Sequence, residues 1–79
     1  MTRLNIIPAK KMIKILRFLD FELIRTKGSH HFFFNKKTQK TTTIPIHGNE
    51  DLGTGILKEI LKDIDLSVAE YEKLRRKIH

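Results

Sequence analysis

Two adjacent histidines, His30 and His31, are the residues of this sequence best suited to acid–base chemistry. An unperturbed histidine exchanges a proton close to neutral pH, so its ring can act as a general base. Cleavage of RNA without a metal ion needs such a base, which takes the proton from a ribose 2′-hydroxyl. His30 and His31 are therefore candidate catalytic residues, although a histidine beside a tight turn can also cap or pack.

The two rings point to opposite faces if the aromatic-rich segment 30–36 forms a strand, because successive side chains of a strand alternate. One ring then meets solvent and the other meets the helices. The pattern does not decide which, since Phe32, Phe33 and Phe34 supply an aromatic side chain on both faces. We expect these phenylalanines to fill the core, although stacking on bases is the alternative.

Gly28 and Ser29 come directly before the histidines. They predict a tight hairpin turn, or a nest of backbone N–H groups that cradles a phosphate, and the local sequence favours neither. Basic residues on both sides are candidate phosphate contacts, which would give affinity and salt dependence without sequence information. As candidate RNA-binding residues we take Arg25, Lys27, Gly28, Ser29, Lys36 and Lys37, although each charge alone can be a plain surface charge.

The positive charge is concentrated in the first part of the sequence. Residues 1–48 carry ten basic and two acidic side chains, whereas residues 49–79 carry six basic and seven acidic ones. The total of +7 is therefore an N-terminal feature. Its partner should be polyanionic, and nucleic acid is the commonest such partner of a basic domain.

The elements that position these residues predict an α+β fold. Apolar periodicity indicates a helix over 8–19, followed by strands over 21–26, 30–36 and 41–46. Two helices follow, one from 54 to about 63 and a short one that starts at Ser67. A three-stranded antiparallel sheet has one face to cover, and the two longer helices can supply the cover.

Several residues predict where these elements end. Thr54 can cap the second helix, whose apolar face would include Ile56. Ser67, followed three residues later by Glu70, is a capping box for the last helix. Pro45 cannot donate a ladder hydrogen bond, so we place it at a strand end or on an edge strand.

Length and composition limit the possible functions. Seventy-nine residues make a single domain over 1–79, too small for multi-domain enzymes and large cofactor folds. With no cysteine there can be no disulfide or thiolate metal site, and the four histidines have no metal-ligand spacing, so we expect neither a metal nor a cofactor. The sequence also has no apolar run long enough to span a membrane and no secretory signal, so we expect a cytoplasmic protein.

Three short motifs resemble the HicA toxin family of bacterial and archaeal toxin–antitoxin pairs. They are the Gly28-Ser29-His30 turn, the strand end Thr43-Ile44-Pro45-Ile46-His47-Gly48, and the helix start Gly53-Thr54-Gly55-Ile56-Leu57. The motifs have the family's order and spacing, and the resemblance runs from about Pro8 to Tyr71. One departure is Asp20, where the family usually has a glycine that ends the first helix in a left-handed conformation, which aspartate also tolerates.

The resemblance implies a double-stranded-RNA-binding-domain-like fold and the activity of an mRNA interferase, a metal-independent endoribonuclease. It also implies mRNA as substrate and a HicB-like antitoxin as partner. It points to His30, the first histidine after the serine, as the catalytic residue, with His31 as second choice. The alternative function is a module that binds double-stranded RNA without cutting it. A weaker alternative is a domain whose basic face serves mainly to dock an acidic antitoxin.

Overall fold

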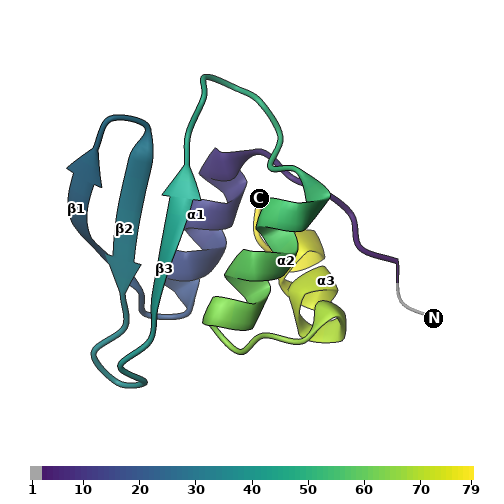
Figure 1. Cartoon of the computed structure of the whole chain (residues 1–79). Helices are drawn as coiled ribbons and strands as arrows, with labels where there is room; N and C mark the ends of the chain where they lie inside the picture. Colours follow the sequence, from purple (N-terminus) through teal and green to yellow (C-terminus); the bar gives the residue numbers. More distant parts are fainter. Residues whose placement is uncertain (1–2) are drawn as a thin grey trace.

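The computed structural model describes residues 3–79 and has the predicted α+β layout (Figure 1). Along the chain the elements are α1 (Ala9–Phe18), β1 (Glu22–Lys27), β2 (His30–Phe34), β3 (Thr41–Pro45), α2 (Thr54–Asp63) and α3 (Val68–Lys77). The predicted order is therefore confirmed. The last helix is not shorter than the others, because all three helices have ten residues.

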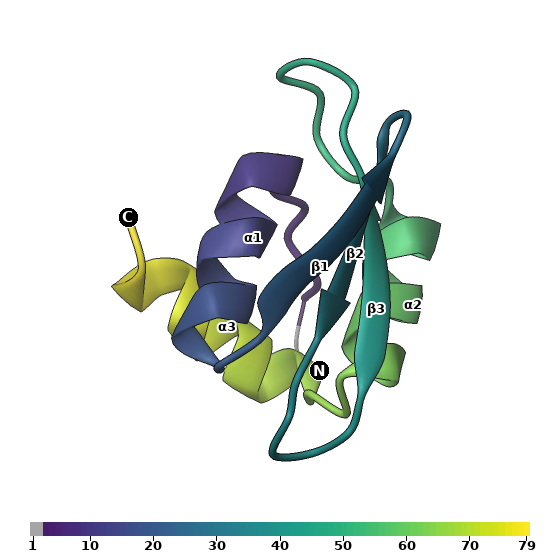
Figure 2. The same ribbon diagram turned by 90° about the vertical axis from the view of Figure 1, so that its left-hand side faces the viewer.

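The strands form one antiparallel sheet in the order β1-β2-β3. Figure 1 shows α1 behind the sheet and α2 beside β3, and Figure 2 views the same sheet from its β1 edge. In Figure 2 α1 and α2 lie on opposite sides of the strands, so α1 covers one face of the sheet, whereas α2 flanks the β3 edge instead of sharing that cover as expected. β3 is an edge strand and Pro45 is its last residue, as predicted from the missing backbone donor.

The core lies between the covered face of the sheet and the helices. Phe33 and Ile44 point into it from β2 and β3, and Met12, Ile15 and Leu16 from α1 are fully buried. Burial of such side chains is the main favourable contribution to folding. Of the three consecutive phenylalanines, only Phe33 fills the core, so that prediction is right for one residue in three.

The neighbours of Phe33, Phe32 and Phe34, are half-buried on the open face of the sheet, defined here as the face turned away from α1. Strand alternation requires this arrangement, because residues two apart share a face. His30 lies on the open face with them, and His31 shares the covered face with Phe33.

A β-bulge interrupts the predicted alternation of β1. Leu23 pairs with Phe33 but Arg25 pairs with Phe32, so Ile24 is the extra residue. Directly opposed residues of two strands share a face, so Leu23 points to the covered face and Arg25 to the open face. Strict alternation would have placed both on one face. The bulge therefore turns the basic end of β1, Arg25 and Lys27, toward the side on which His30 lies.

The helix ends agree with the predictions in two places of three. Asp20, just after α1, has φ 72°, the left-handed conformation expected there. Ser67 caps α3 by accepting a hydrogen bond from the Glu70 backbone N–H at 3.1 Å. At α2, however, Gly53 is the cap and Thr54 is already the first helical residue. Ile56 is also not part of the buried face of α2, since it is 44% exposed.

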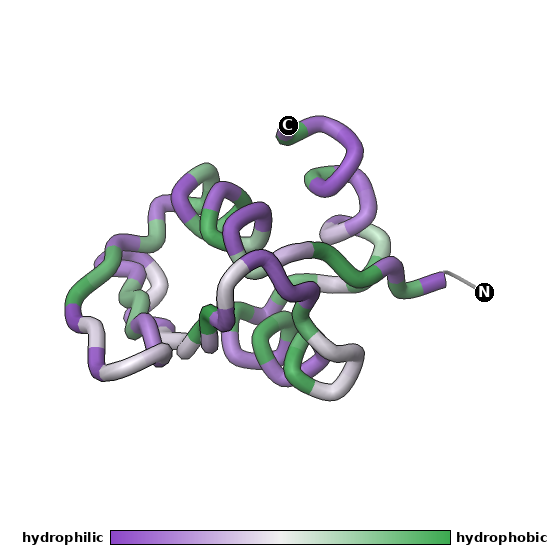
Figure 3. Tube along the Cα trace, turned by 90° about the horizontal axis from the view of Figure 1, so that it is seen from above, coloured by the Kyte–Doolittle hydropathy of each residue, from purple (hydrophilic) through white to green (hydrophobic). Residues whose placement is uncertain are grey.

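The segment before α1 is joined to α3 by a small polar network. The Asn5 backbone N–H and side-chain amide both donate to the Glu72 carboxylate, at 3.2 and 3.0 Å. Arg75 donates to the same carboxylate at 2.7 Å, and the Tyr71 hydroxyl donates to the Asn5 carbonyl. Toward the C-terminus α3 is mainly hydrophilic (Figure 3). The network lies on the inner side of this helix, where Tyr71 and Glu72 are buried.

None of the helices within residues 3–79 has the length and apolar character needed to cross a membrane.

Candidate nucleic-acid interface and active site

His30 lies at the start of β2 on the open face of the sheet, and its side chain is exposed. Its neighbours across the ladder are Lys27 of β1 and Pro45 of β3. The ring is therefore presented to solvent between a cation on one side and a proline on the other. The sequence left open which of the two histidines faces solvent. The burial of Phe33 answers this, because it places His31 and Phe33 together on the face that α1 covers.

His31 is in a different environment on the covered face. It is half-buried, and its Nδ1 donates to the Ser29 carbonyl at 3.1 Å. A carbonyl oxygen only accepts, so this bond requires Nδ1 to carry the hydrogen. The His31 ring thus has a structural role at the hairpin turn, which matches the capping alternative.

The turn between β1 and β2 consists of two residues, Gly28 and Ser29. Gly28 has φ 59° and Ser29 does not have a positive φ, which is the pattern of a type II′ hairpin turn with glycine first. The Ser29 carbonyl also accepts from the Ile46 N–H at 2.8 Å, so the turn is held to the end of β3. The tight-turn alternative is the one this geometry supports for Gly28 and Ser29.

Two cations accompany His30 on the open face. Lys27 is its ladder neighbour, and Arg25 stands over the Phe32 ring with 4.9 Å between the guanidinium carbon and the ring centroid. Such a cation–π contact fixes the guanidinium without neutralising it. Together Arg25, Lys27, His30 and Phe32 form a basic and aromatic surface, here called the His30 surface.

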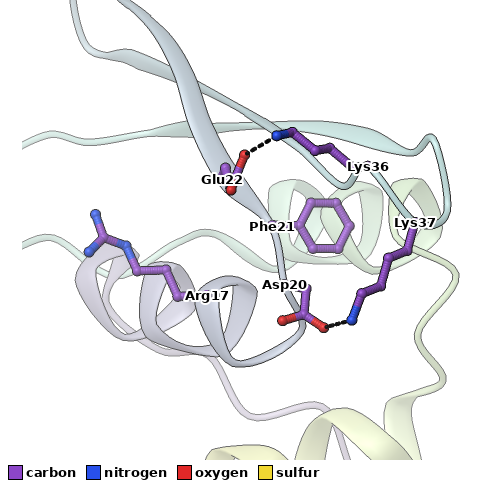
Figure 4. Close-up of a pocket in the computed structure, with 6 residues that line it drawn as sticks. All are labelled: Arg17, Asp20, Phe21, Glu22, Lys36 and Lys37. Atoms are coloured by element: carbon purple, nitrogen blue, oxygen red, sulfur yellow. Dashed lines mark hydrogen bonds and ion pairs between the residues drawn. The ribbon is translucent and has the colours of Figure 1, made fainter.

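The other two predicted cations, Lys36 and Lys37, lie beyond the far end of β2. Six residues of extended chain would separate His30 from Lys36 by about 20 Å at the usual rise of a strand. Both side chains are exposed, and each amine lies near a carboxylate, Lys36 to Glu22 at 3.9 Å and Lys37 to Asp20 at 3.0 Å (Figure 4). The predicted set of phosphate contacts is therefore split, and only Arg25, Lys27, Gly28 and Ser29 lie at the His30 end.

A groove of about 480 Å³ borders His30 on the side of β3 and α2. The open face contributes His30, Thr43 and Pro45, the loop after β3 contributes His47, and α2 contributes Glu59 and Asp63. Asp63 also accepts a hydrogen bond from the Thr42 hydroxyl at 3.0 Å, which joins α2 to the edge strand. The contribution of α2 could not be found in the sequence, since Glu59 and Asp63 read there only as the polar face of a helix.

No cluster of three or more metal-ligating side chains occurs within residues 3–79.

The comparison with protein families adds the decisive observation. The family model described as the HicA toxin of bacterial toxin–antitoxin systems matches residues 9–66, which is most of the chain. The chain belongs to the HicA toxin family. No curated protein and no solved structure matches it.

Membership of the HicA family makes this protein a toxin of a toxin–antitoxin pair, with a cognate antitoxin as its partner. The matched segment contains the sheet, the His30 surface and the groove beside it. It ends before α3, so the helix that carries Tyr71 and Glu72 lies outside the match although Tyr71 is part of the core.

Proposed function

We propose that this HicA-family toxin is a metal-independent endoribonuclease that cleaves mRNA, with His30 as the general base. The observation that carries the proposal is the exposed His30 ring on the open face, next to Lys27 and in the same surface as Arg25. A base and phosphate-binding cations on one face are what a metal-free cut of RNA requires.

In the proposed reaction the RNA backbone lies along the His30 surface. Lys27 and Arg25 neutralise phosphate charge, and a base of the RNA can stack on Phe32 beside Arg25. The His30 ring takes the proton of a ribose 2′-hydroxyl, and the 2′-oxygen attacks the adjacent phosphorus. His31 is an unsuitable base here because its ring lies on the covered face and bonds to Ser29.

The test compares His30→Ala with His31→Ala and the unchanged protein. Purified proteins are incubated with mRNA in the presence of a chelator, and the fragments are separated on a denaturing gel. We expect His30→Ala to lose at least about 100-fold in cleavage, the contribution of a general base, while it still binds RNA. His31→Ala should keep the cut, and unimpaired cleavage by His30→Ala would refute the assignment.

A module that binds double-stranded RNA without cutting it would use the same cations, so charge does not distinguish the two functions. Cleavage does. If the wild-type protein binds duplex RNA and leaves every transcript intact under all conditions tested, the binding module is the correct function.

A further inference from the structure

We infer that His47 is the second catalytic residue of this site, the general acid that protonates the leaving 5′-oxygen. The inference rests on the proposed nuclease function and completes it. A cut of this type needs two proton transfers, one from the 2′-hydroxyl and one to the oxygen that leaves phosphorus. His30 supplies only the first of them.

The ladder places His47 close to His30. The register pairs His30 with Pro45, and the Ile46 N–H donates to the Ser29 carbonyl, so the pairing continues one residue beyond β3. His47 is the next residue and lies two positions from Pro45, diagonal to His30. Diagonal neighbours in a sheet have Cα atoms about 7–8 Å apart, within reach of long side chains.

The groove supports the same pairing. Both His30 and His47 line it, and its volume of about 480 Å³ is large enough to hold a phosphodiester. His47 is exposed, so RNA can reach it from the open face. The backbone of His47 is held in place as well, because its carbonyl accepts from the Glu50 N–H at 3.2 Å.

The proton and electron balance of the step is complete with these two rings. Neutral His30 accepts the 2′-hydroxyl proton while the 2′-oxygen forms a bond to phosphorus. The bond between phosphorus and the 5′-oxygen breaks, its electron pair stays on that oxygen, and the oxygen takes a proton from the His47 imidazolium. The products are a 2′,3′-cyclic phosphate and a 5′-hydroxyl end, with His30 protonated and His47 neutral.

The other side chains of the groove fit this role less well. Asp63 is already bonded to the Thr42 hydroxyl. Glu59, also in the groove, is an acidic side chain, whereas histidine is the side chain that donates and accepts protons close to neutral pH. Glu59 is therefore the matched control.

The experiment uses an RNA oligonucleotide that the wild-type protein cleaves, made a second time with sulfur in place of the 5′-oxygen at the cleaved bond. A thiolate leaves without protonation, since thiols are much stronger acids than alcohols. We expect His47→Ala to cleave the oxygen substrate at least about 100-fold more slowly than wild type, and the sulfur substrate within a few-fold of wild type. His30→Ala should be slow on both, because the base is still needed.

Other outcomes overturn the inference in separate ways. If His47→Ala is equally slow on both substrates, His47 is a binding or structural residue. If the variant has full activity on both, His47 has no role in cleavage. Rescue by sulfur in Glu59→Gln instead would make Glu59 the acid. If His30→Ala cleaves like wild type, the proposed base is wrong, a result that no His47 variant can produce. Circular dichroism and RNA binding of each variant establish that it is folded.

Discussion

Lys27 and Lys36 have the same side chain but different surroundings. Lys27 is the ladder neighbour of His30, whereas Lys36 lies past the other end of β2 and is 3.9 Å from the Glu22 carboxylate. Both Lys36 and Glu22 are well exposed, so their pair contributes little to stability. It does offset the charge of Lys36 locally. Equal charge in the sequence therefore does not imply an equal contribution to the proposed RNA binding.

This difference predicts different salt dependence for two matched variants. Lys27→Ala should weaken RNA binding and reduce the slope of log affinity against log salt by about 0.7, the contribution of one phosphate contact to single-stranded RNA. Lys36→Ala should leave the slope close to that of wild type. Fluorescence anisotropy with labelled RNA over a series of salt concentrations measures both, and a reversed order would place the RNA at the other end of the sheet.

At this scale the sequence indicated candidate residues for the site but not the faces on which their side chains lie. The pair His30 and His31 was identifiable because histidine is the neutral-pH base. Which ring faces solvent depends on Phe33, whose burial is decided by the helices that pack against it. The groove beside His30 was not predicted, because it joins β2 to a helix that starts about twenty residues later in the chain.

Asp20 determines how α1 passes into β1. Its φ of 72° lies in the left-handed region, and the following Phe21 N–H donates to the Leu16 carbonyl at 2.9 Å to close the helix end. Most side chains are strained in this conformation, aspartate less than most, and glycine is not. Asp20 also accepts from Lys37 at 3.0 Å, an exposed contact of small value.

We therefore expect Asp20→Ala to lower the free energy of unfolding by about 1 kcal/mol, the usual penalty for a left-handed alanine. Asp20→Gly should be as stable as wild type or slightly more stable. Urea denaturation followed by circular dichroism compares the three proteins. Equal destabilisation by alanine and glycine would show that the carboxylate, and not the backbone conformation, stabilises this helix end.

The elements themselves were largely predictable, and the exceptions have physical causes. Helix α1 and the strands follow from apolar periodicity and β-branched residues. The N-cap of α2 is Gly53 and not the predicted Thr54, because a glycine can replace a side-chain cap. The bulge at Ile24 left no signal in the sequence, since a strand of mixed apolar and basic residues fits either phase.

On the scale of the whole molecule, Glu72 joins the two ends of the described chain. Its carboxylate is buried and accepts from Arg75 and from Asn5. These contacts, the Arg75 hydrogen bond first, lower the pKa of Glu72 from an ordinary 4.5 to about 2, although burial alone would raise it. A carboxylate with a lowered pKa in the folded state stabilises that state while it stays ionised.

The contribution of Glu72 is thus complete above pH 4.5 and is lost as the pH falls toward 2. We expect Glu72→Gln to be less stable than wild type at pH 7, by about 2 kcal/mol for a buried charged hydrogen-bond partner. The difference should shrink as the pH is lowered through this range. Chemical denaturation at a series of pH values measures it. Glu50→Gln, at an exposed position, is the control and should follow wild type throughout.

The link between Asn5 and Glu72 also has a consequence for synthesis of the protein. Ribosomes make Tyr71 and Glu72 after every residue of the His30 surface and the groove. Until Tyr71 and Glu72 emerge, the residues already made lack one fully buried aromatic side chain of the core. Asn5 also lacks the two side chains to which it is hydrogen-bonded. We therefore expect the interior to close, and the site to be fully ordered, only after α3 has left the ribosome.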